Sequence, residues 1–308
     1  MGLVTSVTQL LVARIFMGLF AGFTPMAMAV ASVSAPRDKV AVAIARVQGA
    51  QLLSAAVGPL AGGLVASQLG IRPAFFVTSG LCAVALGALI FLFREVRPVE
   101  PGEVKAAVRT TPLRDFVRYP HFVTAMFMLV VAQFIDRGLG LMIPLHIAHL
   151  PDVTAIAATS GAIISVAAVG AALSASVAAR LADVMPVGRL LFIELVAGGV
   201  LCGAMALAEG WITLLVLRTL VALCLGGALT LAYSLGGTLV PAESRGAAFG
   251  WLALGVQIGT AASPLVTGAL AALSLSAAYL MDGTLAWIAA AVLLFGARDL
   301  LKRRDAAL

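Results

Sequence analysis

Charged residues are scarce in this sequence. Asp, Glu, Lys and Arg make up 11% of its 308 residues, whereas an ordinary soluble domain contains about one-quarter charged residues. Hydrophobic residues make up 62%, and the mean hydropathy is +1.09. This composition excludes a soluble domain built around one large core. It predicts an all-α membrane protein whose helices of about 20 residues each cross the bilayer.

Cysteine and histidine are also rare. Each of the three cysteines, Cys82, Cys202 and Cys224, lies inside an apolar run, which indicates small hydrophobic residues rather than a disulfide set. His146 and His149 have a spacing that could hold a metal ion, but Asp152 is the single acid nearby and no cysteine accompanies them. The sequence therefore predicts neither a metal site nor a cofactor.

Nine apolar runs are long enough to span a membrane. They cover residues 8–33, 40–66, 72–93, 121–149, 155–179, 189–208, 211–239, 246–272 and 276–297. The stretch 94–120 is the one long polar connection, and it divides three spans from six. We expect it to be a linker.

Basic residues are distributed unevenly between the connections. Fifteen of the 20 Lys and Arg residues fall in 34–39, 94–120, 180–189, 240–245 or the tail after 297, and the opposite set of connections holds only Arg72. By the positive-inside rule, the linker and the C-terminus face the cytoplasm. The sequence thus predicts a multi-pass protein of the cell membrane, such as a bacterial inner membrane. Its basic excess lies at the lipid surface, so no nucleic-acid partner is implied.

An internal repeat organises the chain. Residues 10–14, Leu-Leu-Val-Ala-Arg, match residues 214–218, Leu-Leu-Val-Leu-Arg. Three further pairs match at almost the same offset, namely Pro36 with Pro241, Pro59 with Pro264, and Gly63 with Gly268. Spans one to three therefore repeat spans seven to nine, as in a two-fold repeat of six helices without its first three.

The repeat defines the expected domains. Residues 1–93 form part of an N-terminal transmembrane half, 94–120 a cytoplasmic linker, and 121–308 a six-helix C-terminal half with a basic tail. Met1 to Gln9 carry no charge, unlike the basic start of a signal peptide. We expect a truncated chain, or one that begins at an internal methionine.

Glycine and proline recur at equivalent places in the two parts. Gly58, Pro59, Gly62 and Gly63 lie in the middle of the run 40–66. A proline inside a helix bends it, and glycines let a neighbouring helix backbone come close. The second copy of this pattern consists of Gly259, Pro264 and Gly268. Both copies predict a bendable, closely packed helix that could seal a transport route; tight packing alone is the alternative.

These motifs resemble those of the major facilitator superfamily, and within it the drug/proton antiporter branch. The run 10–14 with Gly18 and Gly22 is similar to the arginine motif of the family's fourth helix. The similarity to its fifth-helix antiporter motif rests on Gly49, Gly58, Pro59, Gly62 and Gly63. Ser54 replaces one glycine of that motif. The family's loop motif between its second and third helices is absent, and its second-half counterpart survives only loosely, at 180–183.

The resemblance implies a major facilitator-type helical bundle of two six-helix halves, in which the nine spans are the fourth to the twelfth. It also implies a secondary transporter that works by alternating access. The few charges and apolar spans favour a small amphipathic substrate, and the resemblance implies that it is exported in exchange for protons. The lipid bilayer, protons and the small molecule are then the partners.

Ionisable residues within spans are candidates for function, because a charge at mid-bilayer costs at least about 2.5–3.5 kcal/mol. Asp136 and Arg137 lie near the middle of the run 121–149. Neighbours on a helix point about 100° apart, so each needs a partner elsewhere. Gln133 and Arg137 share one helical stripe. One interpretation is that Asp136 carries a proton whose affinity Arg137 sets; the other is a structural charge network.

Arg14 and Arg218 occupy matching repeat positions near helix ends. The resemblance implies that Arg14 takes part in proton transfer or gating. The alternative for both residues is a side chain that extends to the headgroups.

Other functions stay open at this point. Within transport, the alternative is uptake or export of a small metabolite. A membrane-embedded enzyme would need His, Asp or Ser clustered at one bilayer face, and the sequence offers no such set. A truncated chain that transports nothing is the third alternative, because alternating access needs two halves around a shared site.

Overall fold

A computed structural model describes residues 1–20, 27, 30, 40–92, 113–119, 121–151, 153–241 and 244–302. The chain divides into two compact units, Met1–Ala107 and Val108–Leu308, which are considered separately. The division falls inside the expected linker 94–120, and within that linker only 113–119 is described. Gly22 and Pro36 of the sequence motifs also lie outside the described residues, as does Asp152.

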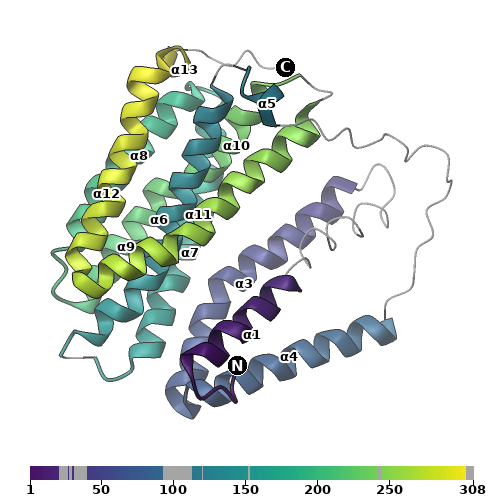
Figure 1. Cartoon of the computed structure of the whole chain (residues 1–308), viewed down its shortest axis with the longest axis vertical. Coiled ribbons are helices and arrows are strands. Elements are labelled where there is room, and N and C mark those ends of the chain that lie inside the picture. The colour runs from purple at the N-terminus through teal and green to yellow at the C-terminus, as the bar shows by residue number, and fades with distance from the viewer. Residues whose placement is uncertain are drawn as a thin grey trace. The chain divides into compact units, whose positions relative to one another are not determined.

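The first unit contains helices α1 (Val7–Leu19), α3 (Val40–Leu69) and α4 (Ile71–Leu92) (Figure 1). Ser6 caps the start of α1, because its hydroxyl accepts a hydrogen bond from the backbone N–H of Gln9 at 3.3 Å. Gly70 separates α3 from α4 with a φ of 95°, a left-handed conformation in which glycine is favoured. The chain can therefore turn back at once, and α4 packs against α3.

The second unit begins with the short helix α5 (Leu113–Phe116) and continues with long helices. They are α6 (Phe122–Ala148), α7 (Ile156–Leu181), α8 (Val187–Met205), α9 (Trp211–Leu225), α10 (Ala228–Thr238), α11 (Arg245–Leu273) and α12 (Leu275–Ala291). The last elements are the π-helical turn η3 (Val292–Gly296) and α13 (Arg298–Lys302). The described residues contain no β-strand.

The prediction of an all-α membrane bundle is confirmed. Within the described ranges, eight helical segments are long and apolar enough to cross a membrane. They correspond to the predicted runs from residue 40 onward. The first predicted run, 8–33, is described mainly as the 13-residue helix α1, and most of its remainder lies outside the described residues.

The run 211–239 is not the single continuous helix that hydropathy predicts. It consists of α9 and α10, which meet at Gly226 and Gly227. A Cβ atom at Gly226 would lie 2.5 Å from the Cα of Ala171 on α7, and one at Gly227 would overlap the Glu194 carboxylate on α8. The break therefore lies where two other helices approach the backbone too closely for any side chain.

Helix α6 lies at the centre of the second unit. It packs against α7, α9, α10, α11 and α12 (Figure 1). Ile135, Leu139, Ile143 and Ile147 follow one another at four-residue spacing, and each is fully buried. Lipid tails are as apolar as these side chains, so close van der Waals packing, not water exclusion, holds such helices together.

Gly259 shows how that packing is achieved between α11 and α6. A Cβ atom there would clash with the carbonyl oxygen of Val130 and lie 3.1 Å from the backbone nitrogen of Phe134. Gly268, one of the predicted motif residues on the same helix, has only an ordinary contact, to Leu141 at 3.8 Å. Tight packing therefore accounts for Gly259 and not for Gly268.

The first-unit motif has a different environment. Pro59 lies inside α3, as Pro264 does inside α11. No described atom lies within 4 Å of a Cβ placed at Gly58 or Gly62, and Gly63 lies in the same helix. The gating role expected for the two copies of the motif stays a prediction.

Replacing Gly259 by alanine should destabilise the protein by about 1–3 kcal/mol, because the added methyl group overpacks the α6 interface. The Tm of the detergent-solubilised protein measures this effect. Gly250→Ala is the matched control on α11, where a Cβ atom meets nothing within 4 Å. It should leave the Tm unchanged or raise it slightly, since alanine favours helix. Equal Tm values for the two variants would contradict this account of the interface.

Candidate functional site

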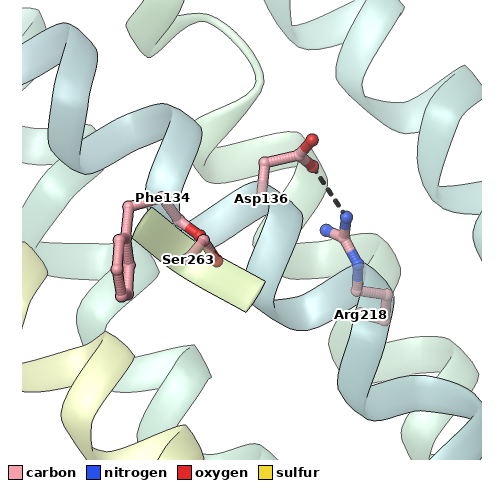
Figure 2. Close-up of polar contacts among 4 residues, drawn as sticks. All are labelled: Phe134, Asp136, Arg218 and Ser263. Atoms are coloured by element: carbon pink, nitrogen blue, oxygen red, sulfur yellow. Dashed lines mark hydrogen bonds and ion pairs between the residues drawn. The ribbon is translucent and has the colours of Figure 1, made fainter. Parts of the chain in front are cut away.

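An ion pair connects α6 and α9 inside the second unit. The Arg218 guanidinium donates a hydrogen bond from Nη2 to Oδ1 of Asp136, over 2.9 Å (Figure 2). Arg218 is only 6% exposed, whereas half of the Asp136 side chain is exposed. Two predicted site residues, 82 positions apart in the chain, are thus brought together.

The pair borders a cavity of about 120 Å³. Asp136 and Arg218 are its only charged lining residues in the part of the chain that is described, and Ile135, Val221 and Leu225 are among its apolar ones. Pockets for drug-sized ligands measure about 300–1,000 Å³. The space enclosed within this unit therefore suits water molecules or a small polar group in contact with a charged pair.

Arg137 and Asp136, although adjacent in the chain, bond different residues. When the side-chain amide of Gln133 has its oxygen facing Arg137, that oxygen accepts hydrogen bonds from Nε of Arg137 at 2.7 Å and from Nη2 at 3.2 Å. Gln133 is buried, and Arg137 is exposed. The two lie four residues apart on one face of α6, as the sequence predicts. The cation in contact with the Asp136 carboxylate is Arg218 and not Arg137.

Arg14 lies on α1 of the first unit with an exposed side chain. Its part in proton transfer or gating stays a prediction. Arg218, its counterpart in the repeat, does not extend to a headgroup position, because it is buried and bonded to Asp136.

Asp282 on α12 is not among the residues predicted from the sequence. This side chain is fully buried, and neither carboxylate oxygen has a hydrogen-bond partner among the described residues. The signal was available, since Asp282 is the only charged residue in the run 276–297. The criterion that selects Asp136, an ionisable group within a span, also selects Asp282.

Three polar side chains converge on Gly138 of α6. A Cβ atom at Gly138 would lie 2.9 Å from Oγ1 of Thr267, 3.1 Å from Oδ2 of Asp282 and 3.2 Å from Oγ of Ser263. We call these four residues the Gly138 cluster. Its two hydroxyl residues come from α11 and are fully buried. The missing side chain at Gly138 is what lets α11 and α12 bring their oxygens to the α6 backbone.

The hydroxyl groups of the cluster differ in their bonding. Ser263 donates to the carbonyl oxygen of Phe134 at 2.7 Å (Figure 2). Thr267 Oγ1 has no hydrogen-bond partner. Arg218 lies within electrostatic range of Asp282, and its buried Nε atom also lacks a partner. The cluster and the Asp136–Arg218 pair are therefore electrostatically connected.

The two histidines at metal-ligand spacing bond to protein groups. His146 Nε2 lies 2.9 Å from the carbonyl oxygen of Ala208, so this nitrogen carries the proton, and Nδ1 accepts from the Tyr279 hydroxyl at 3.1 Å. His149 Nδ1 lies 2.7 Å from the carbonyl oxygen of Leu145. Among the residues described, no three His, Cys, Asp or Glu side chains are grouped as metal ligands.

A second cavity, of about 300 Å³, lies among α7, α8 and α9. Glu194 is its only charged lining residue in the described structure, and one of its carboxylate oxygens, Oε2, is buried without a hydrogen-bond partner. The other lining residues are mainly apolar, such as Leu173 and Ile193.

Comparison with known proteins gives consistent matches. Residues 1–210 and 152–307 match the family described as Major Facilitator Superfamily. The chain is 29% identical over 274 residues to multidrug resistance protein MdtG of Citrobacter koseri, covering 88% of this chain and 67% of that protein. It is 30% identical over 198 residues to the protein of the same name from Salmonella arizonae, covering 64% of this chain and 48% of that protein.

The chain spans about half to two thirds of the length of these curated relatives. Among solved structures, it is similar to a bacterial homologue of the human lysosomal transporter Spinster in an inward-facing, unoccupied conformation. The TM-score is 0.73 at 18% sequence identity, over all of this chain and 81% of that one. This similarity shows a shared helical fold.

The Asp136–Arg218 contact should be measurable as a coupling energy. In a double-mutant cycle of Asp136→Asn and Arg218→Gln, we expect the changes in stability to be non-additive by about 0.5–3 kcal/mol. Unfolding of the detergent-solubilised variants provides the measurement. Asp136→Asn combined with Arg298→Gln is the control, because Arg298 bonds Leu294 instead, and these changes should add. Additivity in both cycles would show that the pair contributes no coupling.

Proposed function

The chain belongs to the major facilitator superfamily, and we propose that it is a secondary transporter exporting a small amphipathic compound in exchange for protons by alternating access. The observation that carries this proposal is the Asp136–Arg218 pair, a carboxylate and a guanidinium on the wall of an otherwise apolar cavity. Charged groups inside a membrane are costly, and they commonly mark ion and substrate pathways.

The pair supports exchange because one carboxylate cannot serve two cations at once. A proton on Asp136 removes the negative charge that holds Arg218, and a cationic or polar group of the substrate would compete for the same oxygens. Binding of substrate then requires loss of the proton. This competition couples the movement of the proton to movement of the substrate in the opposite direction, as in an antiporter. It disfavours cotransport.

The neighbouring polar residues support recognition of the substrate. Arg137 is exposed on the same helix, and its bond to Gln133 fixes the direction of its guanidinium group. The apolar residues around the pair favour an amphipathic compound over a sugar or a phosphate. The printed name of the curated relatives, multidrug resistance protein, agrees with efflux. In the first unit, we assign Arg14 a part in proton transfer by resemblance.

The motif glycines and prolines complete the mechanism. Gly58, Pro59, Gly62 and Gly63 in α3 would close one route while Gly259, Pro264 and Gly268 in α11 close the other, as the two halves rock about the binding site. The distribution of Lys and Arg supports a cytoplasmic C-terminus in the cell membrane.

A liposome assay tests this function. The chain is reconstituted with a pH gradient, and flux of a fluorescent amphipathic dye is followed before and after the gradient is dissipated. We expect gradient-dependent flux that Asp136→Asn abolishes, because asparagine cannot exchange a proton. Glu209→Gln, at an exposed position between α8 and α9, is the control and should retain the flux. Proton-driven flux that persists in Asp136→Asn would refute the role of this carboxylate. Flux of a small metabolite but of no amphipathic dye would favour the alternative substrate class.

A further inference from the structure

Asp282 is buried too deeply for its carboxylate form to be stable without a partner. Its side chain is fully inaccessible, and in the part of the chain that the structure describes both carboxylate oxygens lack hydrogen-bond partners. The large majority of buried side-chain polar atoms in proteins are hydrogen-bonded, and an isolated buried charge is far more costly than a neutral group. Asp282 must therefore either carry a proton or acquire a cationic partner.

The Gly138 cluster has the space for a proton. Oxygens of Ser263, Thr267 and Asp282 already come within 2.9–3.2 Å of the position that a methyl group at Gly138 would take. A proton bound to one of these oxygens needs no added space, so the cluster can hold it without a change in helix packing.

The hydroxyl groups also suit a protonated carboxyl group. Ser263 commits its own proton to the Phe134 carbonyl oxygen, so toward Asp282 it can only accept. Thr267 Oγ1 has no partner among the described residues, so it can accept from a carboxyl O–H or donate its own proton to a carboxylate oxygen. A carboxyl O–H would satisfy one of these oxygens after a small rotation. A carboxylate, which only accepts, would gain nothing from Ser263.

Arg218 is positioned to compensate Asp282 when the proton leaves. Its Nη2 bonds Asp136, its buried Nε is free, and its charge acts on Asp282. A guanidinium has five N–H donors in a fixed plane. One cation therefore stands within the electrostatic range of two acids, one of them at a cavity and one of them fully enclosed.

We propose that Asp282 is a second proton-binding site, and that on losing its proton it takes Arg218 from Asp136. Its contribution to transport rests on the proposed function, whereas the protonation itself does not. With Asp282 protonated, Arg218 neutralises Asp136. When the O–H bond of Asp282 breaks and the proton passes to a water molecule, Arg218 neutralises Asp282.

The exchange balances in charge. Before proton loss, the two acids and Arg218 sum to zero. Afterwards they carry one net negative charge, located on Asp136 at the cavity wall, where one cationic group of the substrate can compensate it. Rebinding of a proton to Asp282 returns Arg218 to Asp136 and displaces that group. The site therefore exchanges one proton for one positive charge on the substrate.

The other titratable groups near Asp282 do not supply this charge. Cys202 on α8 and Tyr279 on α12 lie within electrostatic range, but thiols and phenols are ordinarily neutral at pH 7. From α6, His146 bonds Tyr279, and Asp136 bonds Arg218. From α11, the groups that face Asp282 are the Ser263 and Thr267 hydroxyls.

Infrared spectroscopy on the purified, substrate-free chain tests the protonation directly. A pH titration should reveal the carbonyl band of a protonated carboxyl group, and Asp282→Asn should remove it. Glu194→Gln is the matched control, since it removes another acid within a span and should retain the band. Asp136→Asn releases Arg218 toward Asp282, so it should shift the titration of the band to lower pH. Persistence of the band in Asp282→Asn, or its loss in Glu194→Gln alone, would overturn the assignment.

A second variant keeps the test valid if Asp282→Asn fails to fold. Gly138→Ala alters no charge but places a methyl group against Asp282 and Thr267, so it should shift the titration of the band. Gly140→Ala on the same helix has no atom within 4 Å of the added carbon and should not shift it. Equal titrations in the two variants would contradict the cluster as the proton site.

Transport measurements distinguish a failure of the second proton site from a failure of the proposed function. In liposomes, Asp282→Asn should lose proton-driven dye flux while it keeps dye exchange without a pH gradient. Full proton-driven flux in Asp282→Asn would overturn the second site and leave the proposed function standing. A titrating Asp282 band in a chain that shows no flux at all would support the second site while the proposed function fails.

Discussion

A guanidinium group enclosed among apolar helices needs a negative partner, and this requirement organises the second unit. Arg218 is almost fully buried, and Asp136 on α6 meets it at 2.9 Å. Without that carboxylate, the free energy of a buried charge would oppose the packing of α9 against α6. The same cation acts on Asp282, so the charge states of two acids depend on one side chain.

Glycine residues determine how closely the charged helices can approach. Gly138 lets oxygens from α11 and α12 reach the α6 backbone, and Gly259 lets α11 lie directly on α6. The α9–α10 break depends on Gly226 and Gly227 in the same way. In lipid, where apolar burial provides no driving force between helices, such contacts supply much of the attraction. The polar cluster is therefore a product of the packing that holds the bundle together.

The sequence predicted the helical spans and two of the central polar residues because these follow from local pattern. Hydropathy located every run from residue 40 onward, and an ionisable group within a span marked Asp136 and Arg218. The pairing of the two was not predictable, since it depends on how α6 and α9 pack, which no local pattern records. Hydropathy also could not reveal the break at Gly226, because glycine next to alanine and leucine keeps the run apolar.

Asp282 carries the same sequence signal as Asp136, an acid within a span, but its complete burial beside Gly138 depends on how α6, α11 and α12 pack. Measuring protons released as substrate binds to the purified chain, in a weakly buffered solution, tests the central claim most directly. If proton and substrate compete for the carboxyl groups around Arg218, binding should acidify the solution, and substitution of Arg218 by glutamine should change the number of protons released. Substrate binding with no change in pH would contradict the account.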